Sequence, residues 1–189
     1  FDYGIPDSVS HEAATFLDGL AVAVHAVEVG GVGPGSWVGV IGLGPIGMLA
    51  AQASRAAGAE RVLAWDVYDV PVRLAREVGL TNVVSAEDTD PVDYMRSQTR
   101  GRGGLDVAFD TVGSEDSIRQ GLGLLAPGGA LVLLAISEKP VSLATIGISG
   151  ERRILSSANN RYPDFPRAIN LLARGLVKVE PLITHRFRL

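Results

Sequence analysis

Gly42-Leu43-Gly44-Pro45-Ile46-Gly47 decides the fold, because this stretch has the glycine spacing G-x-G-x-x-G. In a dinucleotide-binding loop the first glycine permits a tight turn, the second lets the backbone approach a pyrophosphate, and the third lets a helix and a strand pack closely. Residues 37–41, before the loop, have the apolar pattern of a buried strand, and residues 45–57, after it, have helical spacing. A proline is tolerated in the first helical turn, and the remaining amides there, notably that of Ile46, would face an anion.

An acidic residue follows the next predicted strand. Residues 61–65 are apolar enough for a second strand, and Asp66 comes nineteen residues after Gly47. A carboxylate at this place accepts hydrogen bonds from the ribose of NAD and repels the extra phosphate of NADP. There are two alternatives. One is a plain glycine turn with a solvated aspartate, and the other is a methyltransferase, which also places an acid after its second strand. Our predicted pattern has six parallel strands and no reversed hairpin at the C-terminus, which argues against a methyltransferase.

Apolar runs alternate with helical segments outward from the loop. The predicted strands are residues 37–41, 61–65, 82–84, 106–109, 130–135 and 153–158. The predicted helices are residues 12–29, with Ser10 as N-cap and Gly30-Gly31 as the stop, and residues 45–57, 72–78, 91–99, 115–125 and 164–174. This alternation predicts an α/β fold, namely a single domain with a doubly wound, six-stranded parallel Rossmann sheet.

Composition excludes several classes of function. The net charge is −4, and the seventeen Lys and Arg residues form no basic run, so we expect no nucleic-acid partner. The apolar stretches are too short to span a membrane, and residues 1–4 do not resemble a signal peptide, so we expect a cytoplasmic protein. With no cysteine and only three, widely separated histidines, we expect no metal site in this chain.

Nearly the whole chain resembles the cofactor domain of the zinc-dependent medium-chain alcohol dehydrogenases, in particular the sorbitol and threonine dehydrogenase branch. The segments that carry the resemblance are residues 5–7, 20–26, 42–47, 125–129, 161–162 and 181–187. The resemblance implies that residues 1–30 are a helical segment leading in from a catalytic GroES-like domain that is absent, and that residues 31–189 bind the dinucleotide. It also implies that a catalytic zinc is held only by that missing domain.

The resemblance implies a set of NAD contacts along the carboxyl edge of the sheet. Those residues are Gly42, Gly44, Pro45, Ile46, Gly47, Asp66, Val67, Thr111, Val112, Leu134, Ala135, Ile136, Asn160 and Arg161. The backbone of 134–136 would hold the nicotinamide carboxamide, although Leu134 and Ile136 could equally be strand core. Arg161 could instead be a solvated surface residue. Pro71 stands where this branch often has Arg or Lys, which removes one adenosine contact.

Three residues are implied to act near the substrate. Asp18 stands where polyol dehydrogenases have a glutamate that helps at the zinc, and Arg161 and Tyr162 match a segment that reaches nicotinamide and substrate. The alternative for Asp18 is an ordinary charged helix residue. His25 lies in an apolar helix without an identified partner, so we expect a core or interface histidine rather than a proton relay.

The implied function is hydride transfer between a small alcohol or polyol and NAD in the full-length enzyme, with this chain alone inactive. The alternative is a stand-alone NAD-binding sensor or scaffold without catalysis.

The last predicted strand would be a sheet edge, and exposed edges invite pairing. The family resemblance therefore implies a homodimer that uses Ile154, Leu155 and residues 141–148.

Overall fold

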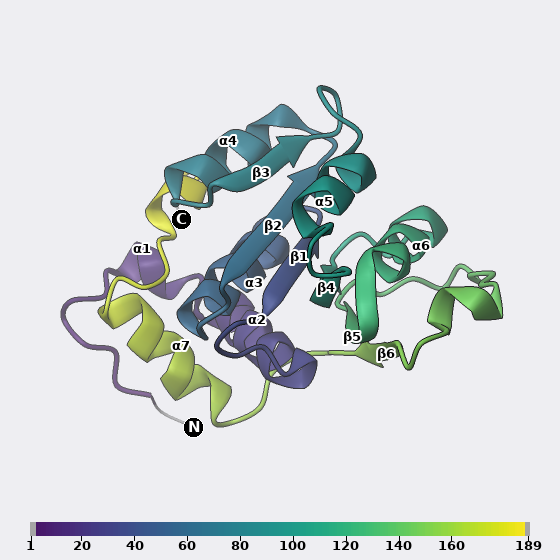
Figure 1. Cartoon of the computed structure of the whole chain (residues 1–189). Helices are drawn as coiled ribbons and strands as arrows, with labels where there is room; N and C mark the ends of the chain where they lie inside the picture. Colours follow the sequence, from purple (N-terminus) through teal and green to yellow (C-terminus); the bar gives the residue numbers. More distant parts are fainter. Residues whose placement is uncertain (1–2, 188–189) are drawn as a thin grey trace.

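The computed structural model describes residues 3–187, and Phe1, Asp2, Arg188 and Leu189, which the predicted domain ranges include, lie outside the described residues. The core of the fold is one parallel six-stranded sheet with helices on both faces (Figure 1). Its strands are β1 (Trp37–Ile41), β2 (Arg61–Asp66), β3 (Asn82–Ser85), β4 (Leu105–Asp110), β5 (Leu125–Leu133) and β6 (Arg153–Ser156). The spatial order β3-β2-β1-β4-β5-β6 is that of a dinucleotide-binding Rossmann fold, which confirms the predicted fold class.

The helices divide into two layers. They are α1 (His11–Ala14), α2 (Leu17–Gly30), α3 (Pro45–Ala56), α4 (Asp69–Glu77), α5 (Pro91–Thr99), α6 (Glu115–Leu124) and α7 (Asp164–Ala173), with short 3-10 turns η1 (Thr145–Ile148) and η2 (Glu180–Leu182). One apolar core joins α2, α3, α4 and α7 to one face of the sheet, and a second joins α5 and α6 to the other. Alternate strand residues supply the two cores: Val38 and Val40 face the first, and Ile41 faces the second. The central strands are therefore apolar on both faces, as in other covered parallel sheets.

The predicted helix over 12–29 is wrong in one respect, because the structure divides it into α1 and α2. The Ser10 hydroxyl caps α1 by accepting from the Ala13 amide at 3.1 Å, as predicted. The Thr15 hydroxyl then donates to the Glu12 carbonyl at 2.6 Å, while the Thr15 amide also donates to that carbonyl. These short-range bonds close the first turn before a continuous helix can form. Gly31, at φ 70°, ends α2, as the glycine pair predicts.

Strand ends differ from the predictions by a few residues. β5 spans Leu125–Leu133 rather than residues 130–135, because its pairing with β4 begins at Leu125 and ends where Leu133 pairs with Asp110. The Leu134 amide makes the last bond of this ladder, to the Asp110 carbonyl at 2.9 Å. β6 stops at Ser156 rather than at residue 158.

Among residues 3–187, no helix has both the length and the apolar character needed to cross a bilayer.

Two glycines of α6 test how tightly this helix packs on the sheet. A Cβ on Gly121 would lie 2.7 Å from Leu131 Cδ1 and 3.1 Å from Ile41 Cδ1, whereas a Cβ on Gly123 would meet no heavy atom within 4 Å. We expect Gly123→Ala to raise the free energy of unfolding by about 0.5–1 kcal/mol through helix propensity. Gly121→Ala should lower it by about 1–2 kcal/mol, because both neighbours are buried and have little room to move. Urea unfolding measures both, and equal stability of the two variants would contradict the packing.

Candidate functional site

The glycine loop connects β1 to α3 at the carboxyl edge of the sheet. Gly42 has φ +86°, and a Cβ there would lie 2.6 Å from Thr111 Oγ1. A Cβ on Gly47 would lie 2.0 Å from the Gly42 carbonyl oxygen, so the loop backbone rests directly on the first turn of α3. Gly44, by contrast, is exposed, and the space around its Cα is open. Packing therefore requires glycine at positions 42 and 47, and Gly44 leaves room beside the helix N-terminus.

Asp66 braces this loop, a role that the sequence analysis missed. Its Oδ2 accepts the Leu43 amide at 2.7 Å, and its Oδ1 accepts the Tyr68 amide at 2.9 Å. The carboxylate is only half-buried and lines a cavity of about 210 Å³. The residues around that cavity are Ile41, Gly42, Trp65, Asp66, Val67, Val112, Ser114, Asp116, Ser117 and Gln120. Each carboxylate oxygen keeps a lone pair for a further donor beside the glycine loop.

The cavity lies where the order of the strands reverses. β1 pairs with β2 on one side and with β4 on the other, and ligands of doubly wound sheets bind at this crevice. Val112 is exposed and lines the cavity. The Thr111 hydroxyl lies within hydrogen-bonding distance of the carbonyls of Ile41 and Gly42, at 2.9 and 3.1 Å, so Thr111 ties the end of β4 to the glycine loop.

A second carboxylate, which the sequence analysis also missed, holds the next loop. Asp110 is fully buried at the end of β4, and its Oδ1 accepts the amides of Val112 and Gly113 at 2.9 and 3.2 Å. Its Oδ2 accepts the Ser117 hydroxyl at 3.2 Å. The signal that could have revealed it is an acid at the end of an apolar strand, four residues before the N-cap Ser114.

Three candidates follow β5 and differ in burial. Leu134 and Ala135 are half-buried, Leu134 packs against the first apolar core, and Ile136 is 93% exposed. The alternative that Ile136 is strand core is therefore wrong, because β5 has already ended at Leu133. The 134–136 backbone follows the carboxyl end of β5, where Leu133 pairs with Ser156 of β6.

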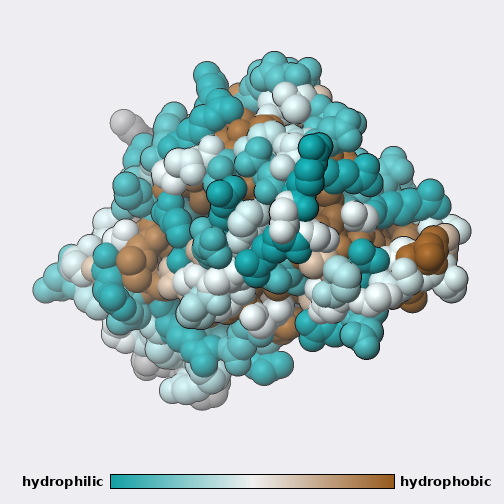
Figure 2. Space-filling model, in the orientation of Figure 1, coloured by the Kyte–Doolittle hydropathy of each residue, from teal (hydrophilic) through white to brown (hydrophobic). Residues whose placement is uncertain are grey.

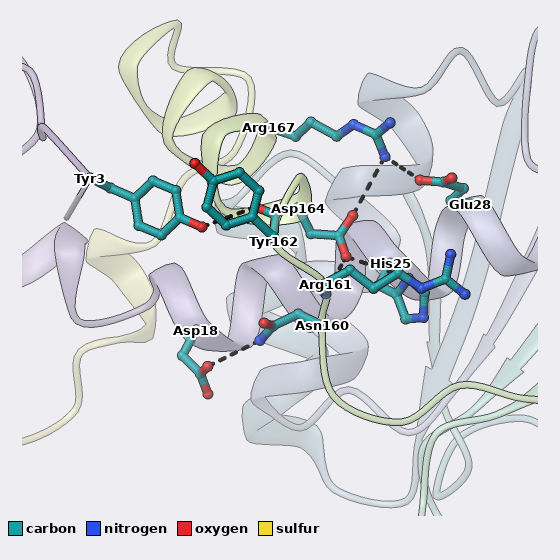
Figure 3. Close-up of polar contacts among 9 residues, drawn as sticks. All are labelled: Tyr3, Asp18, His25, Glu28, Asn160, Arg161, Tyr162, Asp164 and Arg167. Carbon is teal, nitrogen blue, oxygen red and sulfur yellow. Dashed lines mark hydrogen bonds and ion pairs between the residues drawn. The ribbon is translucent and has the colours of Figure 1, made fainter. Parts of the chain in front are cut away.

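The segment after β6 meets the beginning of α2, as Figure 3 shows. The Asn160 side-chain amide donates to Asp18 Oδ1 at 3.1 Å, which joins two candidates that are 142 residues apart in sequence. The adjacent Gly19 contacts α3, since a Cβ there would lie 3.5 Å from Ile46 Cδ1. The start of α2 therefore lies next to both the first turn of α3 and the segment that contains Asn160. Arg161 and Tyr162 are exposed, and the Tyr3 hydroxyl donates to the Tyr162 carbonyl at 3.1 Å.

The sequence identifies no partner for His25, whereas the structure places a buried carboxylate beside it. His25 is buried, and its Nδ1 lies 3.4 Å from Oδ2 of the buried Asp164. Arg167 links this pair to Glu28, and the hydrogen bond and charge of Arg167 hold the pKa of the exposed Glu28 carboxyl below its ordinary value.

Within residues 3–187, no group of three or more histidine, aspartate or glutamate residues is placed to hold a metal ion.

Comparison with known proteins gives a consistent result. Residues 45–174 match the family described as zinc-binding dehydrogenase. The chain is 31% identical over 191 residues to human sorbitol dehydrogenase, covering 100% of this chain and 53% of that protein. It is also 31% identical to L-threonine 3-dehydrogenase of Bacillus licheniformis, covering 96% of this chain and 53% of that protein. The chain therefore spans about half the length of the curated relatives it matches.

A solved structure agrees with these relatives in fold. A zinc-binding dehydrogenase from Sinorhizobium meliloti 1021, described as bound to NADP, superposes with a TM-score of 0.85 at 31% identity. The superposition covers 96% of this chain and 54% of that one.

Two matched substitutions in the glycine loop distinguish a glycine that packing requires from a glycine that faces open space. Gly47→Ala places a methyl group against the Gly42 carbonyl, and we expect it to lower the free energy of unfolding by about 3 kcal/mol or more. Gly44→Ala meets open space, and we expect it to change stability by less than about 1 kcal/mol. Thermal unfolding followed by circular dichroism distinguishes them, and a Gly47→Ala protein as stable as Gly44→Ala would show that the loop does not rest on α3.

Proposed function

The chain belongs to the zinc-binding dehydrogenase family, and we propose that it is the NAD-binding part of an enzyme that transfers hydride between a small alcohol or polyol and NAD. The observation that carries this proposal is the open position at Gly44, which lies between the N-terminus of α3 and the half-buried Asp66 carboxylate. An anion and a ribose would each meet a suitable partner there. The sorbitol and threonine dehydrogenases among the relatives support an alcohol as the substrate class.

The residues present fit a dinucleotide. A Cβ on Gly44 would meet no heavy atom within 4 Å, so there is room for a pyrophosphate beside the first amides of α3, where the helix dipole favours negative charge. The cavity of about 210 Å³ next to Asp66 and Val112 offers apolar walls and a carboxylate, as an adenosine requires. We therefore assign the pyrophosphate to the glycine loop and the adenosine ribose to Asp66 and Val67.

The remaining candidates would act on the nicotinamide half. When bound, the nicotinamide supplies a carbon that exchanges a hydride with the substrate. The backbone of 134–136 would orient its carboxamide, and Asn160 and Arg161 would close over it. Asp18, hydrogen-bonded to Asn160, and the exposed Tyr162 would face the alcohol. Fixing these groups before the substrate arrives lowers the entropic part of the barrier.

A zinc ion does not fit the described residues, because they hold no group of candidate ligands. The chain spans about half the length of its relatives. We therefore propose that the metal of this family binds to the other half. We expect the chain alone to bind NAD and to oxidise no alcohol.

We further propose that two copies associate through β6 as a homodimer. Arg153, Ile154 and Ser156 are exposed along this strand, which is the edge of the sheet. Ile146 in η1 is 75% exposed, and Figure 2 shows apolar side chains at the end of the molecule where η1 lies. An exposed apolar edge strand pairs readily with a second one.

Isothermal titration with NADH and NADPH tests the nucleotide assignment. We expect the chain to bind NADH in the micromolar range and NADPH at least about tenfold more weakly, because Asp66 repels the extra phosphate. Asp66→Asn removes that charge and one bracing acceptor, so it should weaken NADH binding about tenfold and bring the two affinities close together. Asp69→Asn, which removes an exposed carboxylate nearby on α4, is the control and should leave both unchanged. Equal affinity of the unaltered chain for both nucleotides would contradict this role of Asp66.

Sedimentation equilibrium tests the association. The chain should behave as a dimer at micromolar concentration, and Ile154→Lys should make it a monomer because the charge would be buried at the paired edge. Ile5→Lys, which changes an exposed isoleucine far from β6, should leave the dimer intact. A monomer at all concentrations for the unaltered chain would exclude the interface.

A further inference from the structure

His25 and Asp164 form a buried polar pair that the proposed function does not use. His25 lies on α2 and is 6% exposed, and Asp164, at the start of α7, is 1% exposed. The two side chains approach to 3.4 Å between His25 Nδ1 and Asp164 Oδ2 (Figure 3). This contact is electrostatic, attractive when the imidazole carries its proton, and too long for a strong hydrogen bond.

Stability alone does not account for a buried carboxylate. Removing a carboxylate from water is costly, and an apolar pair of similar volume would stabilise α2 against α7 at least as well. An apolar side chain at position 164, however, could not accept a hydrogen bond. Asp164 Oδ2 accepts the Arg161 amide at 2.6 Å, while the Asp164 amide donates to the Arg161 carbonyl at 2.9 Å. Asp164 therefore closes the turn 161–164 with two bonds, one accepted by its carboxylate and one donated by its backbone amide.

This turn carries the residues assigned to the nicotinamide half. Asn160 lies directly before it, and its side chain reaches Asp18 on α2 at 3.1 Å. Asp18 and His25 are seven residues apart on the same helix, so they lie on one face, two turns apart. Helix α2 thus anchors the 160–164 segment at two points, one exposed at Asp18 and one buried at His25.

We propose that His25 and Asp164 are positioning residues, which hold Asn160, Arg161 and Tyr162 in the conformation that receives the nicotinamide half of the cofactor. This inference rests on the proposed function. The adenosine half lies at the glycine loop and Asp66, which make none of these contacts. The pair therefore affects the affinity for the nicotinamide end and leaves the affinity for the adenosine end unchanged.

The experiment compares NADH with adenosine diphosphoribose, which has the same adenosine, pyrophosphate and ribose groups but no nicotinamide. Both ligands are titrated into the unaltered chain and into the Asp164→Ala, His25→Leu and His25→Asn variants. His25→Asn is the conservative variant, because its amide nitrogen can occupy the place of Nδ1. Glu28→Gln is the matched control, since it removes an exposed partner of Arg167 from the same cluster and leaves the two hydrogen bonds between Asp164 and Arg161 in place. Amide hydrogen exchange of Arg161, followed by nitrogen-15 NMR, reports on the turn without any ligand.

We expect Asp164→Ala and His25→Leu to weaken NADH binding about tenfold, while adenosine diphosphoribose binding stays within about twofold. Arg161 should exchange faster in both variants, and His25→Asn and Glu28→Gln should resemble the unaltered chain. If Asp164→Ala does not fold, His25→Leu gives the same test with a side chain of similar bulk.

Two results would overturn the inference. One is an unchanged Arg161 exchange rate in a folded Asp164→Ala or His25→Leu protein, and the other is an equal loss of affinity for both ligands. If the unaltered chain binds neither ligand, the proposed function fails, and the exchange rate of Arg161 by itself decides whether the pair positions the turn.

Discussion

The site depends on the contact between the Gly42 carbonyl and the first turn of α3. The space between them leaves no room for a side chain, since a Cβ on Gly47 would lie 2.0 Å from that oxygen. Because the loop rests on the helix at this point, Gly44 projects into open space beside the helix N-terminus. Glycine at positions 42, 44 and 47 keeps side chains out of the loop where we propose that the pyrophosphate binds.

Three aspartates then brace the loops at the carboxyl edge of the sheet. Asp66 accepts an amide of the glycine loop, Asp110 accepts two amides of the loop after β4, and Asp164 accepts an amide of the segment after β6. A parallel sheet leaves the backbone amides of such loops without strand partners, and a buried carboxylate satisfies them with charge-assisted bonds worth about 1.5–3 kcal/mol each. Only Asp66 keeps enough exposure to serve a ligand as well. Asp110 and Asp164 thus support loops only, and Asp66 is the carboxylate that we propose also binds the ribose.

Much of the fold could be predicted because its signals are local. The alternation of apolar residues in β1, the helical spacing of α3 and the glycine spacing between them each depend on residues close together in sequence. One error arose where a side chain competed with the backbone. The Thr15 hydroxyl closes a turn and divides the predicted first helix through a single hydrogen bond that periodicity does not reveal. The ends of β5, by contrast, are set by its pairing with β4, from Leu105 to Asp110 on that strand.

The sequence by itself determined the parallel α/β fold, the glycine loop and the acid after β2, because glycine spacing and hydrophobic period state them directly. Only the tertiary structure decided which distant polar groups meet. Asp18 pairs with Asn160, and His25 with Asp164, because α7 packs along α2 and carries the segment after β6 over its face. The way in which α7 packs on α2 decides which residue lies beside His25. The residue pattern of either helix alone does not reveal that packing.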